Sequence, residues 1–237
     1  MSATTVTAPT SRASFKDATR VIASPLASLE KRTLIWLAHR MPSRINSDHL
    51  TGLAVLAMLG AGLSYWLASA SPIGLILAVV FLAINWFGDS LDGTLARVRN
   101  RQRPRYGYYV DHVVDALGAL LLFGGMALSG YMSPVIAFGL LILYLMLMVE
   151  VALAAHSIGV FKITQFGMGP TELRILLAIG NLVLLVHPTA VIFGHSFRLF
   201  DVGGAVGIVG LFLTFIISAA RNTRTLYVAE PIPGSKR

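Results

Sequence analysis

From residue 50 onward, long apolar runs alternate with short polar connections. The runs cover residues 50–69, 73–97, 107–130, 133–156, 171–194 and 202–221. A helix of about 20 apolar residues crosses the hydrocarbon core of a bilayer, and each run is close to that length. Pro72, Pro134 and Pro170 lie near the starts of runs, where a missing N–H costs little, whereas Pro188 predicts a break or kink in the fifth. The pattern predicts an all-α membrane protein with six transmembrane helices.

The first 45 residues are basic and rich in Ser, Thr and Ala. No apolar core follows the first methionine, so no cleavable signal peptide is expected. Leu26, Leu29, Leu37 and Met41 recur at near-helical spacing among charged residues, which predicts a short amphipathic helix over 25–41 at the membrane surface. These patterns divide the chain into three parts: a tail over 1–45 containing the juxtamembrane helix, a six-helix transmembrane domain over 46–224 and a second tail over 225–237.

Composition and charge agree with a membrane protein. Hydrophobic residues make up 55% of the 237 residues and charged ones 13%, against about 25% charged in a soluble domain. There is no cysteine, which excludes disulfides, thiolate metal sites and cysteine catalysis. With the N-terminus inside, every Lys and Arg except Arg198 falls on one side, so we expect both termini to be cytoplasmic. The net charge of +8 is then explained by topology and by attraction to anionic membrane lipids, not by binding of nucleic acid.

Four aspartates interrupt the second and third apolar runs. An acid within a span costs about 2.5–3.5 kcal/mol on insertion scales, so such residues point to function. Asp89 and Asp92 are three positions apart, and Asp111 and Asp115 are four apart, so each pair shares one face of a helix. A short inside loop joins the two helices, which predicts antiparallel neighbours with both pairs near the cytoplasmic end of a shared cavity.

Four carboxylates that converge would repel one another unless cations compensate them. Two divalent cations balance the charge, and an all-oxygen site favours Mg²⁺ or Mn²⁺. Two such ions can clamp a pyrophosphate during in-line displacement. Gly93, Ala96 and Gly107 leave room for a bulky ligand, and Arg97 adds positive charge for phosphates.

These residues resemble the signature of a known family. Residues 89–97 fit Asp-x-x-Asp-Gly-x-x-Ala-Arg, and after nine residues 107–115 fit Gly-x-x-x-Asp-x-x-x-Asp, so all eight signature positions are filled. The pattern resembles that of the CDP-alcohol phosphotransferases, also called CDP-alcohol phosphatidyltransferases. In this family the gap is usually eight or nine residues. The expected arrangement of six spans preceded by an amphipathic helix is also similar to that of this family.

The resemblance implies an enzyme of phospholipid biosynthesis, and the expected topology places its active site on the cytoplasmic side. A substituted phosphate group passes from a CDP-alcohol, such as CDP-diacylglycerol, to an acceptor alcohol, and CMP leaves. The resemblance assigns two Mg²⁺ or Mn²⁺ ions to Asp89, Asp92, Asp111 and Asp115, with Asp115 also the general base. It assigns the nucleotide to Gly93, Ala96, Arg97 and Gly107. It also implies a homodimer.

One segment departs from the family pattern. Members often carry Pro-Asn-x-x-Thr at the start of the first span, and here Ser47 and Asp48 replace Pro and Asn while Thr51 is in place. The sequence leaves open whether Asp48 contacts the cytidine.

The acceptor is also left open. Arg174 and Arg221, at inside ends of spans, either bind a phosphorylated acceptor such as glycerol 3-phosphate or inositol phosphate, or only fix the topology. The Asp111-His112 pair instead resembles aminoalcohol phosphotransferases, which use CDP-choline or CDP-ethanolamine and diacylglycerol. Glu150, inside the fourth run, is either functional or part of an interhelical hydrogen bond. From other classes, a cation-coupled transporter and a non-catalytic lipid-binding scaffold also remain.

Overall fold

The structure is a computed structural model that describes residues 19–21, 27–162, 169–230 and 232. The described part is mainly helical, and its helices are α1 Ala27–Arg40, α2 Ser47–Ala68, α3 Ile73–Val98, α4 Pro104–Leu128, α5 Pro134–Ser157, α6 Pro170–Leu184 and α7 Leu199–Ala229. Its strands are β1 Thr19–Val21, β2 Val160–Lys162, β3 Thr189–Ile192 and β4 His195–Arg198. β1 pairs with β2 in parallel, and β3 pairs with β4 as an antiparallel hairpin.

Five of the described helices are long and apolar enough to cross a membrane: α2, α3, α4, α5 and α7. The chain is therefore an integral, multi-pass membrane protein. α6 has 15 residues. At 1.5 Å per residue it is about 22 Å long, shorter than the bilayer's hydrocarbon core of about 30 Å.

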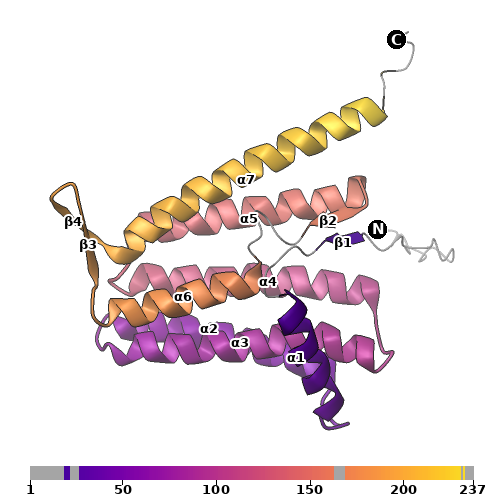
Figure 1. Cartoon of the computed structure of the whole chain (residues 1–237), viewed down its shortest axis with the longest axis horizontal. Coiled ribbons are helices and arrows are strands. Elements are labelled where there is room, and N and C mark those ends of the chain that lie inside the picture. Colours follow the sequence, from indigo (N-terminus) through magenta and orange to yellow (C-terminus); the bar gives the residue numbers. More distant parts are fainter. Residues whose placement is uncertain (1–18, 22–26, 163–168, 231, 233–237) are drawn as a thin grey trace, which may run out of the picture.

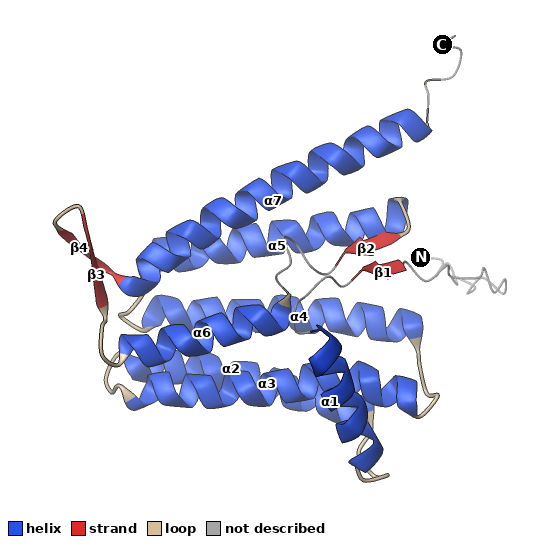
Figure 2. Cartoon of the chain, viewed as in Figure 1, coloured by secondary structure: helices blue, strands red, loops and turns tan. Residues whose placement is uncertain are grey.

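The fifth apolar run, expected over 171–194 with a break or kink at Pro188, is helical only from Pro170 to Leu184. The break expected at Pro188 is present, because the α6 helix has ended before this residue and the β3–β4 hairpin follows it. Figure 2 shows this hairpin projecting beyond the end of the helices. Proline has no N–H to continue a helix and disfavours helical geometry in the residue before it. The hairpin turn carries a positive φ at Phe193 and at Gly194, which a helix does not tolerate.

The helices start where the sequence provides caps. α2 begins with a reciprocal pair: the His49 amide donates to Asn46 Oδ1 at 3.0 Å, and the Asn46 amide donates to His49 Nδ1 at 3.3 Å. Pro104, Pro134 and Pro170 are the first residues of α4, α5 and α6. Such caps satisfy or remove N–H groups that the first turn cannot pair within the helix.

The bundle is assembled around α2, which packs against both α3 and α4, while few backbone positions of α3 and α4 approach each other closely. α5 packs against α4, and α7 against α5. α6 packs mainly against α3. In Figure 1, α1, the α3–α4 connection and the end of α7 lie towards one end of the bundle, and the β3–β4 hairpin lies at the other.

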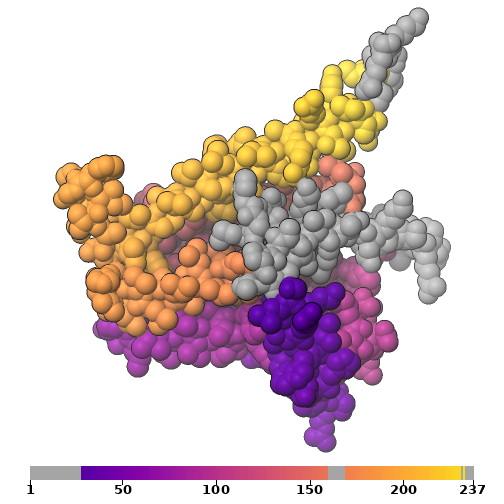
Figure 3. All heavy atoms as spheres, in the orientation of Figure 1, coloured from indigo at the N-terminus to yellow at the C-terminus, as the bar shows by residue number. Residues whose placement is uncertain are grey.

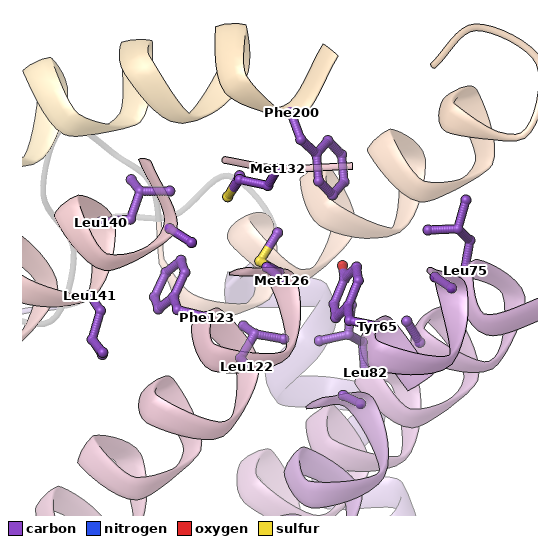
Figure 4. Packing of buried hydrophobic residues seen from close by; sticks show 14 of the residues in the cluster. Tyr65, Leu75, Leu82, Leu122, Phe123, Met126, Met132, Leu140, Leu141 and Phe200 are labelled. Carbon is purple, nitrogen blue, oxygen red and sulfur yellow. The ribbon is translucent and has the colours of Figure 1, made fainter. Parts of the chain in front are cut away.

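A buried apolar cluster joins the helices away from the aspartates. Tyr65, Leu82, Met126, Leu140 and Phe200 lie within it, from five different helices (Figure 4). Many other large apolar side chains on the spans are exposed, as expected for surfaces that face lipid.

α1 lies against the bundle near the ends of α2 and α3. Leu34 and Ala38 of α1 are buried against Leu50, Leu91 and Leu95. In the space-filling view α1 lies on the outside of the bundle (Figure 3). Of the predicted apolar positions, Leu37 and Met41 are half-buried against the same cluster, whereas Leu29 is 65% exposed and Leu26 lies outside the described residues. The position of α1 at the membrane surface stays a prediction.

Candidate active site

Three of the four predicted aspartates come together. Asp89 of α3 and Asp111 and Asp115 of α4 each offer a carboxylate oxygen, and these three atoms lie within 4.8 Å of one another. All three residues are half-buried. α3 and α4 each pack against α2, and their backbones approach each other at few positions. Space therefore remains between them for these side chains.

Asp92 is held differently. Its Oδ2 accepts a hydrogen bond from Thr51 Oγ1 of α2 at 2.5 Å, and its Oδ1 accepts one from the Gly93 amide. Ser47 Oγ donates to the Asp92 carbonyl at 2.8 Å. The fourth aspartate is therefore tied to the start of α2 and lies outside the group of three, and its role as a metal ligand stays a prediction.

Arg174 of α6 reaches the acidic group. Its Nη2 lies 2.6 Å from Asp89 Oδ2, and the two side chains are only 17% and 25% exposed. With all three carboxylates ionised, one guanidinium leaves two negative charges to be balanced. The oxygen donors and this charge deficit fit a hard divalent cation such as Mg²⁺ or Mn²⁺.

The residues predicted for the nucleotide lie beside this group. Ala96 lines a cavity of about 410 Å³ between the start of α2 and the α3–α4 connection. The other lining residues are Asn46, Ser47, Asp48, Leu95, Arg99, Arg101, Gln102 and Arg103. A Cβ at Gly107 would meet nothing within 4 Å, so open space adjoins it, whereas a Cβ at Gly93 would lie 3.4 Å from Arg97 Nη1. Arg97 is exposed, and its Nη2 donates to Thr94 Oγ1 at 3.0 Å.

Asp48 and Arg103 form an ion pair at this cavity. Arg103 Nη2 lies 2.6 Å from both Asp48 oxygens. The hydrogen bond that Arg103 donates to Asp48 raises the pKa of Arg103 above its ordinary value, and the guanidinium also lies 3.9 Å from the centre of the Tyr106 ring. The sequence pattern points to Asp48 but not to Arg103 as its partner, because no local pattern predicts a contact 55 residues along the chain.

Arg99 has a structural role that the sequence did not predict. Its guanidinium donates to the backbone carbonyl groups of Met41, Pro42 and Ile45, at 2.8 Å for Met41 and 3.0 Å for Pro42. These carbonyl groups belong to the connection between α1 and α2. Arg99 thereby joins that connection to the end of α3, on one side of the cavity.

The remaining candidates lie as follows. His112 Nδ1 is 2.9 Å from the Tyr108 carbonyl oxygen, one turn earlier in α4. Glu150 accepts from Ser218 at 3.0 Å and from Asn222 at 2.7 Å, so it links α5 to α7 through the interhelical hydrogen bonds considered as one alternative. Arg221 is exposed on α7, which packs against α5, and the structure does not bring it into the group of three aspartates.

Comparison with known proteins identifies the class. The sequence profile of the family CDP-alcohol phosphatidyltransferase matches residues 47–216, which include all four aspartates and Arg174. The chain belongs to this family of transferases of substituted phosphate groups. It is also similar to the archaetidylinositol phosphate synthase of Pyrococcus horikoshii (strain ATCC 700860 / DSM 12428 / JCM 9974 / NBRC 100139 / OT-3), with 33% identity over 86 residues. That alignment covers 36% of this chain and 43% of the relative, so the chain spans less than half the length of this relative.

Proposed function

We propose that this protein transfers the substituted phosphate of a CDP-alcohol, such as CDP-diacylglycerol, to an acceptor alcohol in phospholipid biosynthesis. The observation that carries the proposal is the group of three carboxylate oxygens from Asp89, Asp111 and Asp115, in a chain whose residues 47–216 match the family. Two Mg²⁺ or Mn²⁺ ions, when bound by these residues and Asp92, would neutralise the diphosphate and the charge that develops on it.

In the proposed reaction the acceptor oxygen attacks the β-phosphorus of the donor. A new phosphodiester bond forms, the bond from that phosphorus to the bridging oxygen breaks, and CMP leaves with that oxygen. Asp115 takes the proton of the acceptor hydroxyl. Phosphoryl transfer depends mainly on positioning and charge stabilisation, so no covalent intermediate on the protein is required.

The cavity beside Ala96 is the proposed place of the nucleotide. Its lining includes Ala96 of the signature, but none of the four aspartates, together with Arg99, Arg101 and Arg103, which suit phosphate oxygens. Ser47 and Asp48 line it too, so the segment that departs from the family pattern still borders the proposed nucleotide site.

We further propose a phosphorylated polyol, such as inositol phosphate, as the acceptor. Arg174 lies at the acidic group, where a phosphate on the acceptor would compete with Asp89 for its guanidinium. The name of the Pyrococcus relative, archaetidylinositol phosphate synthase, agrees with such an acceptor. Arg221 belongs to this proposal only if α7 moves towards the site. His112 would matter for the alternative, an aminoalcohol phosphotransferase with CDP-choline or CDP-ethanolamine as donor and diacylglycerol as acceptor.

The proposed topology has six crossings, with both termini and the active site facing the cytoplasm, and the protein acts as a homodimer. α6 together with residues up to the β3–β4 hairpin would make the fifth crossing. The distribution of Lys and Arg supports this orientation. The aspartates gather near one end of the bundle, which suits a one-sided active site better than the conduit of a transporter.

The test is release of CMP by the purified protein in nanodiscs. The donors are CDP-diacylglycerol, CDP-choline and CDP-ethanolamine, each with Mg²⁺ or Mn²⁺. The acceptors are inositol phosphate, glycerol 3-phosphate, inositol and diacylglycerol. We expect CMP from CDP-diacylglycerol with inositol phosphate. Absence of CMP with every pair, in folded protein that binds CDP, would contradict the proposal, and ion flux in liposomes without turnover of nucleotide would favour a transporter.

A further inference from the structure

The carboxylate of Glu30 links the juxtamembrane helix to two helices of the active site. Its Oε1 accepts hydrogen bonds from Thr171 Oγ1 of α6 at 2.7 Å, from Trp86 Nε1 of α3 at 2.9 Å and from Ser90 Oγ of α3 at 3.3 Å. Glu30 is half-buried, where hydrogen bonds to an ionised acceptor are stronger than in water. In Figure 1 the beginning of α1 lies beside the beginning of α6.

This link is directly beside the acidic group. Ser90 follows Asp89 in α3, and Thr171 precedes Arg174 by three positions, so Thr171 and Arg174 share one face of α6. α3 and α6 are thus joined at two neighbouring places: through Glu30, and through the ion pair of Asp89 with Arg174.

Among the described elements, α6 is short and packs mainly against α3. α1 itself is fixed to α3 by the burial of Leu34 and Ala38 against Leu91 and Leu95. Because α1 is fixed and its Glu30 accepts a hydrogen bond from Thr171, α1 determines where the first turn of α6 lies. The position of that turn then determines which groups the Arg174 side chain can contact.

We propose that Glu30 is a positioning residue of the active site, which holds the first turn of α6 against α3 so that Arg174 meets the phosphate of the acceptor. The part of this inference that concerns the acceptor rests on the proposed function. Glu30 lies before residue 47, where the match to the family begins, so the contribution comes from a part of the chain that the family profile does not match.

Two substitutions of Glu30 test whether its hydrogen bonds, and not only the presence of α1, position the start of α6. Glu30→Gln keeps a carbonyl oxygen that can accept from the same three donors, whereas Glu30→Ala removes the acceptor. Lys31→Ala is the matched control, since Lys31 is the exposed neighbour on α1. Thr171→Val removes one donor and leaves Glu30 in place, which gives a milder variant should Glu30→Ala fold poorly.

For Glu30→Ala we expect KM for inositol phosphate to rise about 10- to 100-fold, the range found when supporting partners of a site are removed. The affinity for Mn²⁺ and KM for CDP-diacylglycerol should stay unchanged, because Asp89, Asp111 and Asp115 stay on α3 and α4. Glu30→Gln and Lys31→Ala should behave like the wild type, and Thr171→Val should shift KM in the same direction by less.

A second measurement does not depend on turnover. Because the chain has no cysteine, Leu176→Cys introduces a single site for a nitroxide spin label on α6, at a position that is 55% exposed. The label should become more mobile in Glu30→Ala and remain as in the wild type in Glu30→Gln. Unchanged mobility and unchanged KM in Glu30→Ala would overturn the inference, as would an equal loss in Mn²⁺ affinity and in both KM values. If the wild type released no CMP, the proposed function would fail, and the spin label alone would decide whether Glu30 holds α6.

Discussion

Arg174 Nη2 of α6 lies 2.6 Å from Asp89 Oδ2 of α3, within the group of carboxylates that the signature predicts. Apart from α1, α6 is the shortest of the described helices, and it places a positively charged side chain at the centre of the candidate site. The pair compensates part of the negative charge of the group, and it places a phosphate-binding side chain beside the residues proposed to hold metal ions.

Replacing Arg174 should weaken binding of the acceptor more than binding of the donor. For Arg174→Ala we expect KM for inositol phosphate to rise about 10- to 100-fold, the equivalent of losing a charged hydrogen bond of about 1.5–3 kcal/mol. KM for CDP-diacylglycerol should change little. Steady-state CMP release checks this, with Arg224→Ala as the control because Arg224 is an exposed arginine of α7. An equal loss with inositol and with inositol phosphate would contradict the assignment.

Removal of one carboxylate from the group of three should abolish metal binding. Asp111→Asn keeps the shape of the side chain but lowers its negative charge, so we expect the Mn²⁺ affinity and CMP release to fall by more than about 100-fold. Titration of Mn²⁺ followed by electron paramagnetic resonance measures the affinity. Glu230→Gln changes an exposed carboxylate at the end of α7 and should have no effect. Wild-type Mn²⁺ affinity in Asp111→Asn would exclude Asp111 as a ligand.

The hydrogen bond from Thr51 should support Asp92. Thr51→Val removes the hydroxyl that lies 2.5 Å from Asp92 Oδ2, and we expect CMP release to fall about 10-fold, as for other partners that orient ligands. Thr51→Ser keeps the hydroxyl and should retain activity. Thr225→Val is the control, since its hydroxyl donates only to a carbonyl of its own exposed helix end. If Thr51→Ser were as impaired as Thr51→Val, packing and not the hydrogen bond would be responsible.

Two neighbouring glycines of α4 should differ sharply in tolerance. A Cβ at Gly125 would overlap the backbone of Gly62 in α2, whereas a Cβ at Gly124 would meet nothing within 4 Å. Gly125→Ala should therefore destabilise the protein by about 1–3 kcal/mol, the cost of overpacking. Gly124→Ala should be neutral or slightly stabilising, because alanine favours helix over glycine by about 1 kcal/mol. Thermal unfolding in detergent compares them, and equal midpoints would contradict the close approach of α2 and α4.

The sequence predicted the local features of this protein well. Apolar runs predicted the five long helices, because hydrophobic length is a property of a continuous segment. Spacings of three and four placed each aspartate pair on one side of its helix, and the signature identified the family that the profile match confirms. Pro188 predicted the break in the fifth run.

Other features could not be predicted from local pattern. A fifth span with a break or kink at Pro188 was expected to reach residue 194, yet the helix ends at Leu184 and the chain turns into a hairpin. α3 and α4 were expected to be neighbours, and three of their aspartates do meet, yet the backbones of both helices pack mainly against α2. Both outcomes depend on how whole helices pack, and apolar composition carries little information about which face meets which partner.

The sequence by itself thus determined a multi-pass membrane protein of a particular transferase family, with its acidic residues at helical spacing. Only the tertiary structure decided that Asp92 turns to Thr51, that Arg174 pairs with Asp89 across 85 residues, and that Glu30 meets Thr171 across 141. The physical reason is that a polar side chain in a low-dielectric bundle must find a partner, and the fold, not proximity along the chain, determines which partner lies within reach.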